Sequence, residues 1–124
     1  MATTDDVKNS IVINHPIIDI RSKSEFDGSF DAKYSFFKES GHIPKAIHIG
    51  NWNELIDMKS NRLKDVKEIR KIWNESFEIS DQNYIIFYCG TGWRSSIGFF
   101  LANMMGLKAK NYDSGFYGWS LYGN

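Results

Sequence analysis

Hydrophobic residues in this chain come in short runs separated by glycine, proline and polar residues, a pattern typical of alternating strands and helices. The uncharged run 84–88 leads into Cys89 and predicts a buried strand of a parallel sheet. Shorter runs at 11–13, 17–20 and 47–49 predict further strands, and 108–112 predicts a weaker one. With helices between the strands, the expected fold class is α/β, a parallel sheet with helices on both faces.

The helices have their own sequence signals. A Ser-x-x-Glu capping box predicts a short helix over residues 22–28. Apolar residues at helical spacing predict an amphipathic helix over 65–77. Two serines open a third helix, over 95–105, and a glycine ends it. Residues 51–58 are expected to form a helical turn, and 29–40 a folded loop or an irregular helix.

Length and composition limit the kinds of protein to consider. The 124 residues suggest a single domain over 11–124, after a linker or disordered segment at 1–10. Fifteen charged residues of each sign leave the net charge near zero, so neither nucleic acid nor a membrane surface is an expected partner. A single cysteine can form neither an internal disulfide nor a cysteine-rich metal site, and no metal or cofactor is expected. A lone reactive thiol fits a reducing compartment, so a cytoplasmic location is expected.

Cys89 is the candidate nucleophile. It stands where a strand ends, and Gly90 and Gly92 then allow a tight turn before the next helix begins. Inward-pointing loop amides, the helix dipole and the charge of Arg94 would all favour a thiolate over a thiol. A buried structural cysteine is the alternative interpretation, but it leaves the two glycines unexplained.

Four segments together resemble the rhodanese, or sulfurtransferase, domain. They are Asp-Ile-Arg followed by Glu-Phe at 19–26, Gly-His-Ile-Pro-Lys-Ala at 41–46, Tyr-Cys-Gly-Thr-Gly-Trp-Arg at 88–94, and Tyr-Asp-Ser-Gly-Phe-Tyr-Gly-Trp at 112–119. Each segment alone is a weak signal, but all four in this order and spacing are specific. The resemblance extends from about Ile11 to Tyr122 and implies a rhodanese fold with a five-stranded parallel sheet.

The loop that begins at Cys89 distinguishes branches of the sulfurtransferase family. Its first four residues look like those of mercaptopyruvate sulfurtransferases, whereas the full Cys-Gly-Thr-Gly-Trp-Arg looks more like the catalytic half of tandem thiosulfate sulfurtransferases. The chain is therefore expected to be a carboxyl-terminal domain whose native partner is a second rhodanese domain. The chain differs from the family at Lys45, where glycine is common, and at 114–116, where Gly-Gly-Trp is common. Neither position is expected to touch the nucleophile.

The resemblance implies a two-step reaction through a persulfide on Cys89. The thiolate takes a sulfane sulfur from a small-molecule donor, thiosulfate or 3-mercaptopyruvate, and a thiol or cyanide then accepts it. Loop amides would stabilise the persulfide anion. The residues expected to bind the substrate are Gly90, Thr91, Gly92, Trp93 and Arg94.

Individual roles follow from side-chain chemistry. Arg94 is assigned to the anionic donor, because a guanidinium matches oxyanions bidentately. Trp93 is expected either to line the wall of the pocket or to pack against other side chains. Asp19 and Arg21 are expected to form a structural ion pair near the loop, and His42 a structural hydrogen bond rather than a catalytic contact.

Three other functions share some of these features. A cysteine phosphatase also cradles an anion above a cysteine, but it places five residues before its arginine, whereas four separate Cys89 from Arg94. A non-catalytic rhodanese module used for binding or sensing would not need the cysteine. A thiol redox sensor would need a second cysteine to resolve the oxidised one within the chain, and there is none.

Overall fold

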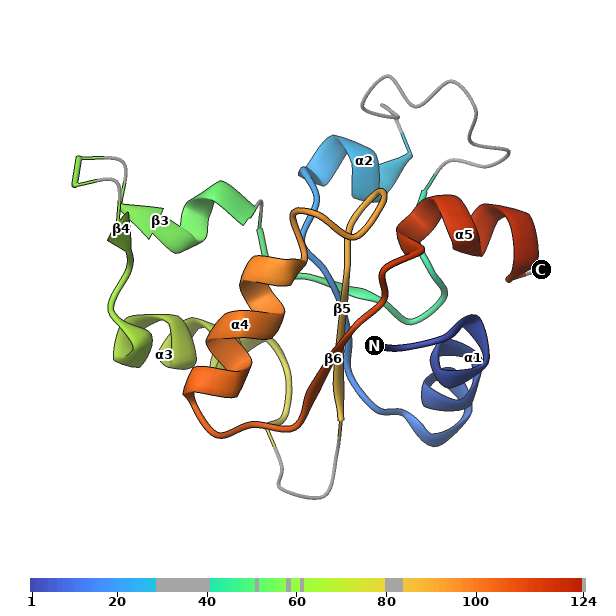
Figure 1. The fold of residues 1–124 in the computed structure, drawn as a ribbon, viewed down its shortest axis with the longest axis horizontal. Helices are drawn as coiled ribbons and strands as arrows, with labels where there is room; N and C mark the ends of the chain where they lie inside the picture. The colour runs from blue at the N-terminus through green and yellow to red at the C-terminus, as the bar shows by residue number, and fades with distance from the viewer. Residues whose placement is uncertain (29–40, 51, 58, 61, 80–83, 124) are drawn as a thin grey trace.

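The computed structural model describes residues 1–28, 41–50, 52–57, 59–60, 62–79 and 84–123 (Figure 1). The expected loop or irregular helix at 29–40 lies outside these residues. The helices are α1 (Thr4–Ile13), α2 (Lys23–Asp27), α3 (Val66–Ser76), α4 (Ser96–Met104) and α5 (Gly115–Tyr122), with a 3₁₀ turn η1 (Trp52–Leu55). The strands of the main sheet are β1 (Ile17–Asp19), β2 (Ile47–His48), β5 (Ile85–Tyr88) and β6 (Ala109–Asn111).

The main sheet is parallel throughout, in the order β2-β1-β5-β6. A separate antiparallel pair joins β3 (Ile56–Asp57) to β4 (Arg62–Leu63). Figure 1 shows α3 and α4 on one face of the main sheet and α1 and α5 on the other. The α/β fold with a parallel sheet between helices, expected from the sequence, is therefore confirmed.

Strand β5 is buried on both faces, as its uninterrupted apolar sequence predicts. Ile85 and Phe87 face the core under α3 and α4, whereas Ile86 and Tyr88 face the core under α1 and α5. The Cys89 side chain lies on the same side as those of Ile85 and Phe87. The central strand thus delivers the cysteine at the carboxyl-terminal edge of the sheet.

The amino-terminal segment contradicts two expectations. Residues 11–13 are not a strand but the end of α1, so the main sheet has four strands within the described residues rather than five. Residues 1–10 are likewise mostly helix rather than a linker. The cause is a capping box between Thr3 and Asp6, together with burial of Val7 against the sheet. These interactions outweigh the modest strand preference of β-branched residues.

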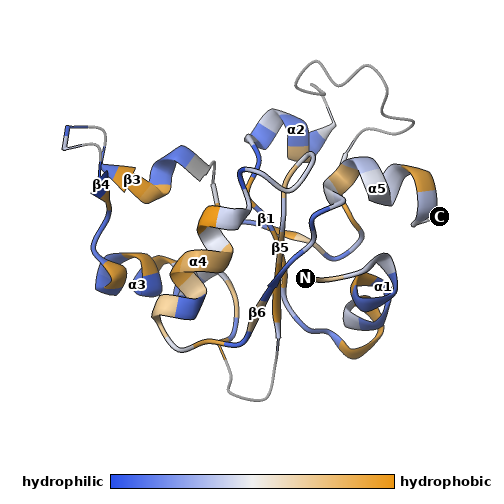
Figure 2. Ribbon diagram, viewed as in Figure 1, coloured by the Kyte–Doolittle hydropathy of each residue, from blue (hydrophilic) through white to orange (hydrophobic). Residues whose placement is uncertain are grey.

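The amphipathic helix expected over 65–77 is confirmed as α3. The Asp65 carboxylate accepts a hydrogen bond from the Lys67 amide at its start. Ile69 and Trp73 are fully buried, and the Trp73 ring lies 5.3 Å from that of Phe87 on β5. Figure 2 shows this division into an apolar and a polar side along α3.

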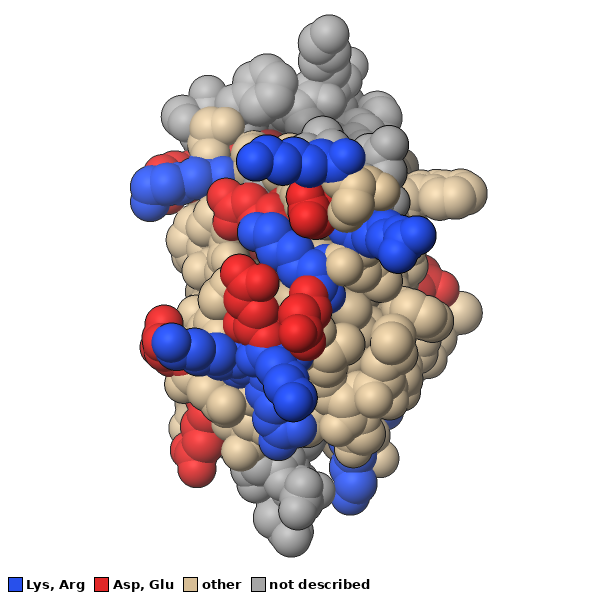
Figure 3. Space-filling view, turned by 90° about the vertical axis from the view of Figure 1, so that its left-hand side faces the viewer, with Lys and Arg blue, Asp and Glu red and all other residues tan. Residues whose placement is uncertain are grey.

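Charges of both signs lie among each other on the side of the molecule that carries β4 and α3. Figure 3 shows lysine and arginine side chains adjoining aspartate and glutamate across that face. The described part of this face therefore shows no continuous patch of one sign. None of the described helices has the length and apolar character required to cross a bilayer.

Candidate active site

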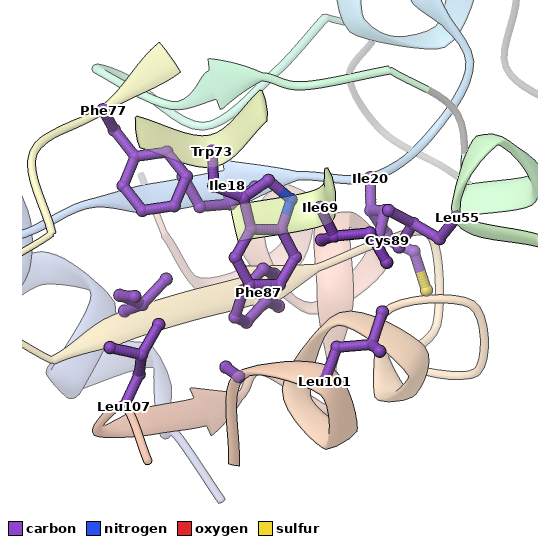
Figure 4. Packing of buried hydrophobic residues seen from close by; sticks show 12 residues of the cluster. Ile18, Ile20, Leu55, Ile69, Trp73, Phe77, Phe87, Cys89, Leu101 and Leu107 are labelled. Atoms are coloured by element: carbon purple, nitrogen blue, oxygen red, sulfur yellow. The ribbon is translucent and has the colours of Figure 1, made fainter. Parts of the chain in front are cut away.

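The Cys89 side chain lies inside the loop that joins β5 to α4. It is 1 % exposed, and its Sγ accepts a hydrogen bond from the Gly92 amide at 3.1 Å. Figure 4 shows the sulfur directed toward this loop, beyond the aromatic core around Trp73. Within the described residues the amides of Gly90, Thr91 and Trp93 have no hydrogen-bond partner. The loop thus places one N–H on the sulfur and leaves others unpaired, which suits an anion.

Two glycines allow the loop and α5 to meet closely. Gly92 has a φ of +96°, and a Cβ there would lie 2.5 Å from the Asp113 carbonyl oxygen. Gly115 has a φ of +60°, and a Cβ there would clash with the Gly90 carbonyl oxygen. The start of α5 donates two amides to the loop, from Phe116 to the Cys89 carbonyl at 2.8 Å and from Tyr117 to the Gly90 carbonyl at 3.0 Å. The expectation that residues 114–116 do not touch the nucleophile is therefore wrong for its backbone, because these residues begin α5.

Asn111, at the end of β6, holds the loop from the other side. Its side chain donates to the Gly92 carbonyl at 3.2 Å and accepts from the Ser95 hydroxyl at 2.6 Å. Ser95 was expected to help open the helix, and it does precede α4, but its hydroxyl makes no capping bond to the helix amides. It instead bonds Asn111 and the Gly92 carbonyl, so its role is to fix the loop.

Arg94 forms a bidentate ion pair with Glu25 of α2. Its Nη1 and Nη2 donate to the two carboxylate oxygens at 2.8 and 3.0 Å. Burial alone would raise the pKa of Glu25, but the hydrogen bonds and charge of Arg94 outweigh it and lower that pKa below its ordinary value. The Arg94 guanidinium, which was expected to bind the anionic donor, is therefore already paired with a carboxylate of the protein.

The expected ion pair between Asp19 and Arg21 is present and buried, with Nη2 and Oδ2 2.7 Å apart. The Tyr88 hydroxyl donates to the same Asp19 oxygen at 2.8 Å and accepts from the Ile43 amide. Burial, and next the charge of Asp19, raise the pKa of Tyr88 well above its ordinary value. Arg21 also lies 4.5 Å from the ring centre of Phe116, so this network sits directly beneath the start of α5.

The remaining predicted residues lie at the surface or in local structure. His42 donates to the Phe26 carbonyl at 2.8 Å and stacks on the Phe26 ring, which agrees with a structural role. Trp93 is 84 % exposed, so of its two expected positions it takes the wall rather than the core. In the described part of the chain no group of three or more His, Cys, Asp or Glu residues could hold a metal ion.

A hollow of about 380 Å³ opens beside the loop. Its lining residues are Thr91, Gly92, Trp93, Ser96 and Asp113. Gly92 belongs to both the hollow and the sulfur site, because its amide is bonded to Sγ. A larger hollow, of about 640 Å³, lies between β4 and α3 and contains none of the predicted site residues.

Sequence reasoning found the cysteine loop but missed several of the residues that hold it. Glu25 was recognised as a helix-capping residue and as part of the first family segment, but not as the partner of Arg94, 69 residues further along the chain. Asn111 gave no signal of its own, since single polar residues at a strand end are common, and Asp113 was visible only as part of the family segment at 112–119. Gly115 was visible as part of a turn, and its positive φ shows why glycine stands there.

Comparison with known proteins agrees with this geometry. The family model for the rhodanese-like domain matches residues 3–122. Thiosulfate sulfurtransferase YnjE of Escherichia coli (strain K12) is 34 % identical over 110 residues, which cover 84 % of this chain and 25 % of that protein. A putative thiosulfate sulfurtransferase of Haloferax volcanii (strain DS2) is 31 % identical over 99 % of this chain and 43 % of its own length. The chain belongs to the rhodanese-like domain family, whose relatives named here are sulfurtransferases.

Solved structures show the same fold. Wild-type EanB matches 97 % of this chain with a TM-score of 0.85 and 29 % identity. The anaerobic ergothioneine biosynthesis enzyme from Chlorobium limicola, bound to its substrate trimethyl histidine, matches the same share with a TM-score of 0.83. In each case this chain covers 29 % of the larger protein, so the chain spans less than half the length of the relatives and structures compared.

Proposed function

We propose that this domain transfers a sulfane sulfur from thiosulfate or 3-mercaptopyruvate to a thiol or cyanide through a persulfide on Cys89. The observation that carries the proposal is the hydrogen bond from the Gly92 amide to Sγ, inside a loop whose other amides, those of Gly90, Thr91 and Trp93, have no partner among the described residues. Such dipoles stabilise a thiolate before the reaction and a persulfide anion after it, with little reorganisation. The names of the two curated relatives support thiosulfate as the donor.

In the first step the Cys89 thiolate attacks the outer sulfur of the donor. A new S–S bond forms, the old bond to that sulfur breaks, and its electron pair leaves with sulfite or with the enolate of pyruvate. In the second step the acceptor attacks the outer sulfur of the persulfide, and the electron pair returns to Sγ. Each step moves one electron pair and one sulfur, so no external oxidant or reductant is consumed.

The structure changes one assignment within this proposal. Because Arg94 is bound by Glu25, the loop amides rather than the guanidinium would receive the anionic group. Arg94 would then fix the end of the loop to α2. We also propose that a second rhodanese domain accompanies this one in the native protein and that the reaction takes place in the cytoplasm.

Mass spectrometry of the intact protein after incubation with thiosulfate tests the proposal. We expect a gain of one sulfur atom on Cys89, removed by cyanide with formation of thiocyanate. Cys89→Ser should gain no sulfur and transfer none. If Cys89→Ser transfers sulfur as well as the parent, the proposal is wrong; hydrolysis of an aryl phosphate that depends on Cys89 would instead support the phosphatase alternative.

A further inference from the structure

The hollow beside the loop is lined by a carboxylate that forms no ion pair with any described residue. Two charged side chains lie at or beside the loop, those of Arg94 and Asp113. Arg94 forms an ion pair with the buried carboxylate of Glu25. Asp113 lines the hollow and is exposed, and no described residue forms an ion pair with it. Its Oδ1 accepts a hydrogen bond from the Asn111 amide at 2.8 Å. Asp113 therefore gives the hollow a negative charge that no described cation pairs with.

The same hollow is walled by an exposed aromatic ring. Trp93 is 84 % exposed and lines the hollow together with Asp113. An indole face attracts organic cations through its quadrupole, and a nearby carboxylate adds a Coulombic attraction for the same charge. An exposed tryptophan and a carboxylate without an ion pair at one hollow therefore favour an ammonium group there.

We propose that the hollow binds the positively charged ammonium group of the sulfur acceptor, so that this domain prefers an aminothiol to a neutral or anionic thiol. The inference rests on the proposed function. The bound thiolate attacks the outer persulfide sulfur, the S–S bond to Cys89 breaks, and the electron pair returns to Sγ. The thiol proton goes to solvent. Gly92 connects the two parts, because it lines the hollow and also donates its amide to Sγ.

Single-turnover transfer from the loaded protein tests this preference. The persulfide is formed with thiosulfate, the excess donor is removed, and decay of the persulfide is followed by mass spectrometry. Three small thiols of similar size serve as acceptors: cysteamine (cationic), 2-mercaptoethanol (neutral) and mercaptoacetate (anionic). Each rate is compared between the parent and Asp113→Asn, so that differences in intrinsic thiol reactivity cancel. An asparagine can still accept the bond from Asn111, so this variant removes mainly the charge.

We expect Asp113→Asn to slow transfer to cysteamine roughly threefold to tenfold, to leave 2-mercaptoethanol unchanged and to speed mercaptoacetate. Trp93→Leu should slow transfer to cysteamine more than transfer to either of the other two thiols, and it provides an independent test if Asp113→Asn folds poorly. Asp57→Asn, which removes an exposed carboxylate on β3, is the matched control and should change none of the rates. If the ratio of the variant's transfer rate to the parent's is the same for all three thiols in both variants, the inference is wrong. If no thiol and no cyanide removes sulfur from the parent, the proposed function itself fails and the inference with it.

Discussion

Gly92 is the residue at which the loop backbone, the sulfur and the neighbouring chain meet. Its amide bonds Sγ, its carbonyl accepts from Asn111, and its α-carbon faces the backbone of Asp113. A side chain at this position is excluded twice, by the φ of +96° and by the Asp113 carbonyl 2.5 Å from a Cβ. The geometry of the sulfur site therefore depends on a residue that contributes no side chain.

Gly92→Ala should reduce both stability and sulfur transfer. We expect a loss of about 1–3 kcal/mol of unfolding free energy from backbone strain and displacement of Asp113. The displaced amide would also lower the rate of persulfide formation roughly 100-fold, as expected for loss of an aligned donor. Thermal or denaturant unfolding and the mass-spectrometric assay measure the two effects.

Gly106→Ala is the matched control for this substitution. Gly106 also has a positive φ, +76°, but a Cβ there would meet nothing within 4 Å. This variant should show the strain without the displacement, and its rate of sulfur transfer should equal that of the parent. A Gly92→Ala protein as active as Gly106→Ala would contradict the role given to the amide.

Lys45 allows a second comparison at single-residue scale. It has a φ of +66°, and its ammonium group donates to the Ile11 carbonyl and to the Asn14 side chain, at the end of α1. Lys45→Gly and Lys45→Ala both lose these contacts, but only alanine keeps the left-handed strain. Lys45→Gly should therefore be more stable than Lys45→Ala by about 1 kcal/mol, measured by denaturant unfolding. Equal stabilities would show that the backbone relaxes in both.

At the scale of elements, the Glu25 carboxylate joins α2 to the cysteine loop. Glu25 accepts from the Ser22 hydroxyl within the capping box and from both terminal nitrogens of Arg94. A helix of only five residues has little stability of its own, so this shared contact fixes its position against the loop.

Glu25→Gln should destabilise the protein by about 1–3 kcal/mol, because the amide presents a donor to one arginine nitrogen and cancels the ion pair. Asp27→Asn, on the same helix, removes only an exposed pair with Lys23 at 3.8 Å and should cost about 0–0.5 kcal/mol.

The lowered pKa of Glu25 also predicts how stability depends on pH. Its stabilisation is present above the ordinary carboxyl pKa and is lost as the pH falls through the folded value, so Glu25→Gln should flatten the acid limb of stability against pH. An unchanged acid limb would exclude this contribution.

The elements that the sequence predicted correctly are those whose signals are local. The run into Cys89 carries its own burial pattern, and α3 carries both an amphipathic period and a capping residue. The strand expected at 11–13 was wrong because three β-branched residues are weak evidence beside the capping box at Thr3. The contacts that complete the site, from Glu25, Asn111 and Gly115, join residues distant in the chain. No single-sequence pattern contains that information.

At the scale of the whole molecule, one of the two cores encloses a polar network. Asp19, Arg21 and Tyr88 form a buried hydrogen-bonded network within the second core, under α1 and α5. Every group in such a network must keep its partner, because an unpaired polar group costs more than the bond returns. The network lies between the central strands and the start of α5, which in turn donates two amides to the cysteine loop. Global stability and loop geometry are therefore linked.

Alkaline unfolding should report this link. The pKa of Tyr88 is raised well above its ordinary value, and burial also raises that of Tyr112, against the effect of its bond to Thr4. Above pH of about 10 the unfolded chain releases these phenol protons while the folded chain retains them. The free energy of unfolding should therefore fall as the pH rises, by at most about 1.4 kcal/mol per pH unit for each tyrosine.

Tyr88→Phe separates the two parts of this effect. At neutral pH it should cost about 1–3 kcal/mol, because Asp19 loses a donor and the Ile43 amide loses its acceptor. Between about pH 10 and 11 its stability should fall less steeply than that of the parent, since one of the two raised phenols is gone. Tyr122→Phe, at a position 68 % exposed, is the control for removing a hydroxyl at the surface. If Tyr88→Phe and the parent show parallel alkaline slopes in urea unfolding, the phenol of Tyr88 must ionise without unfolding the chain, and the network cannot be as closed to water as its geometry implies.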